Sequence, residues 1–162
     1  MSRLGHWIVF VLLVGTTFGC DRVTKRLAAL ELAGTAGESF LADTVRLEYA
    51  ENRGAFLSVG AGLPASLRTG LFTVATGIVL VGGLFVAVRY EWSGLPLAGL
   101  ALVFAGGASN VFDRLLRGSV IDFMNVGLGP LRTGIFNVAD VAILAGVAML
   151  IATRARLTEP RR

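Results

Sequence analysis

The chain has 162 residues, of which 54% are hydrophobic and 16% are charged, and its formal net charge is +4. Soluble domains contain about a quarter charged residues, so a soluble globule of this length lacks the polar side chains needed to cover its surface. The same apolar excess excludes an intrinsically disordered chain. We therefore expect one membrane-embedded domain, residues 1–162, that crosses the bilayer several times.

Several classes of site are excluded by the residue types that are scarce. A single cysteine and a single histidine exclude a disulfide framework and a Cys/His zinc site. The basic residues form no stripe interleaved with aromatic residues, which argues against nucleic-acid binding. An arginine cluster after the last apolar run is typical of a tail that binds anionic phospholipid, and it consists of Arg154, Arg156, Arg161 and Arg162. We expect no metal, cofactor or nucleic-acid partner.

Long stretches without charge predict the membrane spans, because a helix needs about 20 apolar residues to cross a bilayer. The expected helices are residues 5–22, 69–88, 94–113 and 136–153. The first stretch, between Arg3 and Asp21, has an alternative interpretation as a cleaved secretory signal of the lipoprotein type that ends before Cys20. Phe18 argues against cleavage, since a small residue is required two positions before that cysteine. The fold class is therefore an all-α, four-span membrane protein.

The connection between the first two spans is expected to hold a small β-sheet at the membrane surface, at about residues 40–60. Val45, Leu47 and Tyr49 alternate with charged residues, which is typical of a half-buried strand. Residues 52–54 indicate a turn, and residues 55–59 are expected to form the return strand. The shorter connection between the last two spans is interpreted as a loop.

Four spans bring both termini to one side of the membrane. The basic tail favours the cytoplasm for the termini and the outer face for the long loop. Spans that alternate in direction then bring four aspartates to the same outer surface. Asp21 ends the first span, Asp113 ends the third, Asp122 lies in the following loop, and Asp140 begins the fourth. Asn52 in the long loop joins them there.

Two of these aspartates follow an asparagine by three residues, in the pairs Asn110–Asp113 and Asn137–Asp140, so each pair shares a helix face. An ionisable residue inside a membrane is costly and marks a functional site by default. Two carboxyl groups in poorly solvated surroundings share one proton, and such a pair can activate water and protonate a carbonyl oxygen. Asp122 and Asp140, both in apolar company, favour aspartic peptide hydrolysis.

Other interpretations of the same residues remain open. Asp21 and Lys25 could form an exposed i, i+4 ion pair of little consequence, and Asp113 with Arg114 could be an interfacial pair that only ends a span. Asp140 could simply cap the last helix. A proton-coupled carrier would also hold buried aspartates, although it would need them at mid-depth or on both sides. A non-catalytic scaffold protein would tolerate the loss of both Asp122 and Asp140.

Five segments together carry a family resemblance: residues 21–25, 52–56, 107–114, 120–123 and 136–140. In this order the chain resembles the lipoprotein signal peptidases (signal peptidase II), which are bacterial intramembrane aspartyl peptidases. One departure lies in the second segment, where Ala55 alone separates Gly54 from Phe56 and the family usually has two small residues.

The resemblance implies a function and a role for each residue. The substrate would be a prolipoprotein with a diacylglyceryl-modified cysteine, cleaved on the amino side of that cysteine by a monomer, near the outer face of the bacterial cytoplasmic membrane. Asp122 and Asp140 would be catalytic, while Asp113 would orient its neighbours. Asp21 and Lys25 would brace the first span against the surface sheet. The residues implied to position the substrate and the two aspartates are Asn52, Gly54, Asn110, Arg114 and Asn137.

Overall fold

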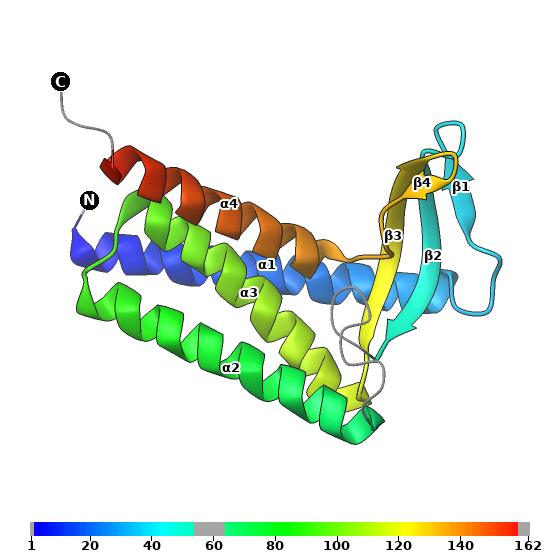
Figure 1. Ribbon diagram of the computed structural model, residues 1–162, viewed down its shortest axis with the longest axis horizontal. Helices are drawn as coiled ribbons and strands as arrows, with labels where there is room; N and C mark the ends of the chain where they lie inside the picture. Colours follow the sequence, from blue (N-terminus) through cyan, green and yellow to red (C-terminus); the bar gives the residue numbers. More distant parts are fainter. Residues whose placement is uncertain (1, 54–63, 159–162) are drawn as a thin grey trace.

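A computed structural model describes residues 2–53 and 64–158 of the chain. Within them it contains four helices: α1 (Arg3–Glu31), α2 (Ala65–Arg89), α3 (Gly94–Arg117) and α4 (Val138–Thr158). Figure 1 shows the helices side by side and alternating in direction. The first turn of α1 and the last turn of α4 lie at one end of the bundle, and a small sheet lies at the other.

Three helices of the described chain are long and apolar enough to cross a membrane, namely Arg3–Glu31, Gly70–Arg89 and Gly94–Arg117. The fourth expected span corresponds to a shorter apolar stretch, Val138–Thr153, in the part of α4 whose side chains are described. The prediction of a mainly helical membrane protein is thus confirmed at the level of the fold class.

The first helix runs to Glu31, well past its predicted end at residue 22. Residues 23–31 are rich in leucine, alanine and basic side chains that favour helix, so nothing in the local sequence stops α1 at the membrane surface. Its final turns pack on the sheet, where Ala28 and Leu32 form a buried cluster with Phe123.

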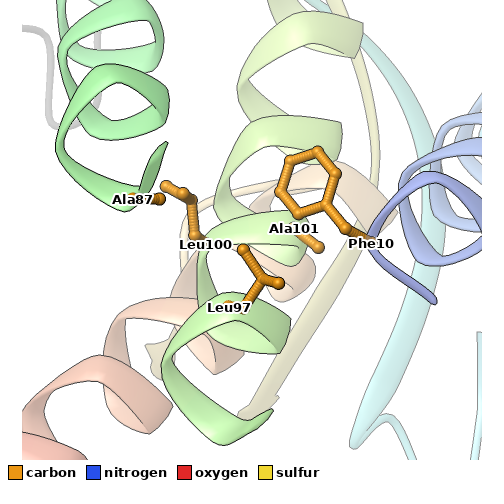
Figure 2. Close-up of a cluster of buried hydrophobic side chains, with 5 residues drawn as sticks. All are labelled: Phe10, Ala87, Leu97, Leu100 and Ala101. Carbon is orange, nitrogen blue, oxygen red and sulfur yellow. The ribbon is translucent and has the colours of Figure 1, made fainter. Parts of the chain in front are cut away.

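A small apolar core joins three helices at the bundle end that carries the termini. Phe10 of α1, Ala87 of α2, and Leu97, Leu100 and Ala101 of α3 are buried against one another, and Figure 2 shows their side chains converging. Most of the other large apolar side chains of α1 and α2 stay exposed on the outside of the bundle. An apolar exterior of this kind is suited to lipid rather than water.

Helices α3 and α4 make the closest helix contact in the bundle because glycines line both sides. A Cβ atom added at Gly146 would overlap the backbone carbonyl of Gly99 and lie 2.8 Å from Cγ2 of Val103. A Cβ atom at Gly106 would likewise overlap the carbonyl oxygen of Ala139. Small residues let helix backbones approach closely in membranes, and this approach brings the start of α4 against α3.

The sheet has four antiparallel strands in the order β1 (Glu38–Phe40), β2 (Val45–Asn52), β3 (Val120–Leu128) and β4 (Leu131–Arg132). The expectation of a sheet confined to the long connection is wrong, because β3 and β4 belong to the connection between α3 and α4. The expected return strand at residues 55–59 lies outside the described residues. Strand β2 pairs instead with β3, about 70 residues away in sequence, with Asn52 opposite Val120 and Ala50 opposite Asp122. Local alternation cannot reveal such a distant partner.

Replacing Gly146 by alanine tests the close contact between α3 and α4. We expect Gly146→Ala to lower the free energy of unfolding by about 1–3 kcal/mol, because the added methyl group overpacks the interface. Gly82→Ala is the matched control, since nothing lies within 4 Å of a Cβ atom there. Thermal unfolding in detergent micelles measures both, and equal melting temperatures for the two variants would contradict the packing described here.

Candidate active site

Asp122 lies near the start of β3, where the chain enters the sheet directly after α3. Its side chain is almost fully buried, with 3% of its surface exposed. Asn52, at the end of the neighbouring strand β2, donates from Nδ2 to Asp122 Oδ2 at 3.0 Å. Asn137 donates from Nδ2 to the other oxygen, Oδ1, at 2.6 Å. The non-local pairing of β2 with β3 therefore supplies one of the two donors.

Asp140 lies in the first turn of α4 and forms a reciprocal cap with Asn137. The backbone N–H of Asp140 donates to Asn137 Oδ1 at 3.0 Å, and Asp140 Oδ2 accepts from the backbone N–H of Asn137 at 3.1 Å. This is a capping box, so the interpretation of Asp140 as a helix cap is correct. It uses only one carboxylate oxygen, because Asp140 Oδ1 accepts a bond of 2.9 Å from Asn110 Nδ2 on α3.

One residue, Asn137, connects the two aspartates. The side chain of Asn137 is fully buried, and its Nδ2 donates to Asp122. Its side-chain oxygen Oδ1 accepts from the backbone N–H of Asp140, and its backbone N–H donates to the Asp140 carboxylate. The same Nδ2 also lies 3.4 Å from Asn110 Oδ1. The structure therefore brings Asp122 and Asp140, together with Asn110 and Asn137, into a single hydrogen-bonded group built from β3, α3 and α4.

The pKa of Asp122 is raised to about 6, mainly by burial and also by the negative charge of Asp140, while hydrogen bonds from Asn52 and Asn137 and the charge of Lys25 act in the opposite direction. A carboxyl group with this pKa exchanges its proton near neutral pH. Beside a second carboxylate, it has the properties needed for general acid–base chemistry.

A buried ion network lies beneath the aspartate pair. Lys25 is fully buried, and its Nζ is 2.7 Å from Asp21 Oδ2 and 2.9 Å from Asp113 Oδ2. Arg22 pairs with the other oxygen of Asp113. Both carboxylates are fully buried as well. The interpretation of Asp21 and Lys25 as an exposed surface pair is therefore wrong, because α1 presents this turn to the other helices.

Asp21 also holds the neighbouring helices directly. Its Oδ2 accepts from Ser109 Oγ at 2.6 Å, and its Oδ1 accepts from the backbone N–H of Ala139 at 2.8 Å. Its partners thus lie on α3 and α4 rather than on the sheet. Asp113 does not end its helix either, since α3 continues to Arg117.

Residues 13–156 match the sequence model of the family described as signal peptidase (SPase) II. The chain belongs to this family. It is 35% identical to a lipoprotein signal peptidase of Sphingopyxis alaskensis, over 92% of this chain and 86% of the relative. It is 36% identical to a lipoprotein signal peptidase of Chlorobium phaeovibrioides, over 90% of this chain and 88% of the relative.

The fold also matches solved structures. Two structures described as a bacterial membrane enzyme superpose with TM-scores of 0.80 and 0.81, at 22% and 23% identity. They cover 95% and 94% of this chain, and 93% and 94% of theirs. At this level of identity the superposition shows that the fold is shared.

Two further residues were expected at the site of this signal peptidase II family member, Arg114 and Gly54. Arg114 donates to the backbone carbonyl of Asn110 at 3.3 Å and lies within electrostatic range of both Asp122 and Asp140. Gly54 lies outside the described residues. Arg22 and Ser109 belong to the ion network, which lies outside the hydrogen-bonded group of the aspartate pair, and neither was expected there, although both lie inside the segments that carry the family resemblance. Within residues 2–53 and 64–158, no three His, Cys, Asp or Glu side chains are grouped as metal ligands.

Replacing Asn52 by alanine tests the electrostatics of Asp122. The amide of Asn52 stabilises the carboxylate form, so its loss raises the pKa of Asp122 above its value of about 6. Infrared spectroscopy of the carboxylic acid C=O band, assigned with Asp122→Asn, measures the midpoint. Tyr49→Phe on the same strand is the control, because the Tyr49 hydroxyl bonds Glu51 instead. An unchanged or lower midpoint in Asn52→Ala would contradict the assigned contact.

Proposed function

We propose that this chain is an intramembrane aspartic endopeptidase that removes signal peptides from diacylglyceryl-modified prolipoproteins, cleaving on the amino side of the lipidated cysteine. Membership of the signal peptidase II family and the lipoprotein signal peptidase relatives support the substrate class. The observation that carries the chemistry is the hydrogen-bonded group in which Asn137 holds both Asp122 and Asp140.

In the proposed mechanism, the two aspartates share one proton and one water molecule. The ionised carboxylate accepts a proton from the water as the water attacks the scissile carbonyl carbon. The protonated partner donates its proton to the carbonyl oxygen, which gives a tetrahedral intermediate. The carboxyl group that took the proton from water then passes it to the nitrogen of the lipidated cysteine, the C–N bond breaks, and a hydroxyl group of the intermediate returns a proton to the other carboxylate as the new carboxyl group forms. The pKa of Asp122, raised to about 6, supports this sharing, because both protonation states are accessible near neutral pH.

The asparagine side chains and Arg114 have a positioning role in this mechanism. Asn52 and Asn137 each bond one oxygen of Asp122, and Asn110 bonds one oxygen of Asp140, so the pair cannot rotate freely. Strand β2 ends at Asn52 beside the pair, and an extended substrate segment can lie against the sheet at this point. Arg114 is close enough to the pair to balance negative charge that develops during attack.

The proposed arrangement in the membrane has four spans within a single domain, residues 1–162. Helix α4 serves as the fourth span, both termini face the cytoplasm, and the sheet and the aspartate pair lie at the outer face of the bacterial cytoplasmic membrane. The alternating helices and the basic residues after the last apolar run support this orientation. The signal helix of the substrate would approach a monomeric enzyme sideways through the bilayer, with its acyl chains left in lipid.

Replacing either aspartate by asparagine tests the proposed chemistry. We expect Asp122→Asn and Asp140→Asn each to lower the cleavage rate at least about 1,000-fold, because an amide can neither accept the proton from water nor return one. The measurement is cleavage of a purified diacylglyceryl-prolipoprotein in detergent micelles. Asp43→Asn is the control, since that exposed carboxylate pairs with Arg46 and Arg132 on the sheet. Normal cleavage by the Asp140→Asn protein would remove the assignment.

Cysteine labelling tests the proposed orientation. In a Cys20→Ser background, we expect a membrane-impermeant maleimide to label Gly134→Cys in intact spheroplasts. Ser93→Cys, in the connection between α2 and α3, should react only after the membrane is permeabilised. Both positions are exposed and lie at opposite ends of the bundle. The reverse pattern would place the aspartate pair at the cytoplasmic face.

A further inference from the structure

We propose that Lys25 is a positioning residue for the aspartate pair, because its ammonium group fixes the side-chain amide of Asn110 with the NH2 group facing Asp140. This inference rests on the proposed function and assigns a role to a group that lies one contact away from the reacting atoms. It goes beyond the expectation that Asp21 and Lys25 brace the first span against the surface sheet.

Three oxygen atoms lie around the ammonium group of Lys25. Its Nζ atom is 2.7 Å from Asp21 Oδ2, 2.9 Å from Asp113 Oδ2 and 2.8 Å from Asn110 Oδ1. An ammonium group has three donors and no acceptor. Two of its contacts are ion pairs with the carboxylates that compensate its burial, and the third is a hydrogen bond to the neutral amide of Asn110. Bracing the helices requires only the two carboxylate contacts, so the third contact needs another explanation.

The third contact determines which way the Asn110 amide points. A donor-only group can face the amide oxygen but not the amide NH2 group, and a carboxylate can face the NH2 group but not the oxygen. Lys25 Nζ lies 2.8 Å from Asn110 Oδ1, closer than Asn137 Nδ2, which lies 3.4 Å from the same oxygen, and Asn110 Nδ2 donates to Asp140 Oδ1 at 2.9 Å. A flipped amide would set donor against donor at Lys25 and acceptor against acceptor at Asp140.

The two cations of the network, Lys25 and Arg22, can be compared directly. Lys25 and Arg22 both pair with Asp113, while Asp21 is the second anion. Loss of either cation leaves the same excess of one negative charge. Only Lys25 touches Asn110, however, whereas Arg22 lies with its guanidinium over the ring of Phe112, 5.0 Å from the ring centroid.

The test compares Lys25→Met with Arg22→Met in steady-state cleavage of a diacylglyceryl-prolipoprotein in detergent. We expect Lys25→Met to lower kcat about 10- to 100-fold with KM within about twofold, because loss of one charged hydrogen bond near reacting groups has effects of this size. We expect Arg22→Met to keep kcat within about threefold of the unmodified chain. Equal losses in both variants would assign the effect to the charge of the network and overturn the proposal.

A double-mutant cycle with Asn110→Ala provides a readout that a structural role would not change. When the Asn110 amide is absent, Lys25→Met should lower kcat by less than about threefold further, because there is no amide left to orient. A loss of the same size in both backgrounds would show that Lys25 acts by another route. Unchanged kcat in Lys25→Met alone would also overturn the proposal.

Folding is controlled separately, because Lys25 lies among buried carboxylates. If Lys25→Met lowers the melting temperature, Lys25→Met/Asp113→Asn is compared with Arg22→Met/Asp113→Asn, since each retains one cation and one anion. Failure of the first double variant to fold while the second folds would give Lys25 a purely structural role and overturn the proposal. The Asp140→Asn protein separates the two hypotheses, because cleavage by that variant would remove the proposed function itself.

Discussion

The aspartate pair at the end of the apolar helix bundle depends on the hydrogen-bond donors around its two carboxyl groups. Carboxylates out of water are costly unless donors or cations compensate them. In this chain the donors next to the pair are neutral amides, contributed by Asn52, Asn110 and Asn137. Neutral donors fix the geometry of the carboxyl groups without a full positive charge, so one of them can still hold a proton near neutral pH.

The charges that support this arrangement lie one layer further in. The network of Asp21, Lys25, Asp113 and Arg22 is anchored on α1 and α3 and touches α4 through the backbone of Ala139. Removing one partner from a buried ion pair is strongly destabilising, because it leaves an uncompensated charge. The network therefore specifies one relative position of three helices, and it transmits that position to the aspartate pair through Asn110.

Close packing of α3 and α4 and the pairing of β2 with β3 complete the site from two other directions. The glycines at the helix interface bring the start of α4 against α3, so Asn137 and Asp140 reach Asn110. The sheet brings Asn52 beside Asp122 from a connection distant in sequence. The last turns of α1 pack on this sheet, so the strand that carries Asp122 is held from both sides.

The sequence by itself determined the helical membrane class, because charge-free stretches of about 20 residues have few other uses, and it singled out Asp122 and Asp140 by their apolar surroundings. It also placed each asparagine on the same helix face as the aspartate three residues later. Asn137 does bond its own aspartate, Asp140, whereas the amide of Asn110 crosses to Asp140. Only the tertiary structure decided that Asp21 and Lys25 are buried and that β3, in the connection between α3 and α4, pairs with β2. These features are contacts between segments far apart in the chain, and local patterns of charge and hydropathy contain no information about which distant segment meets which.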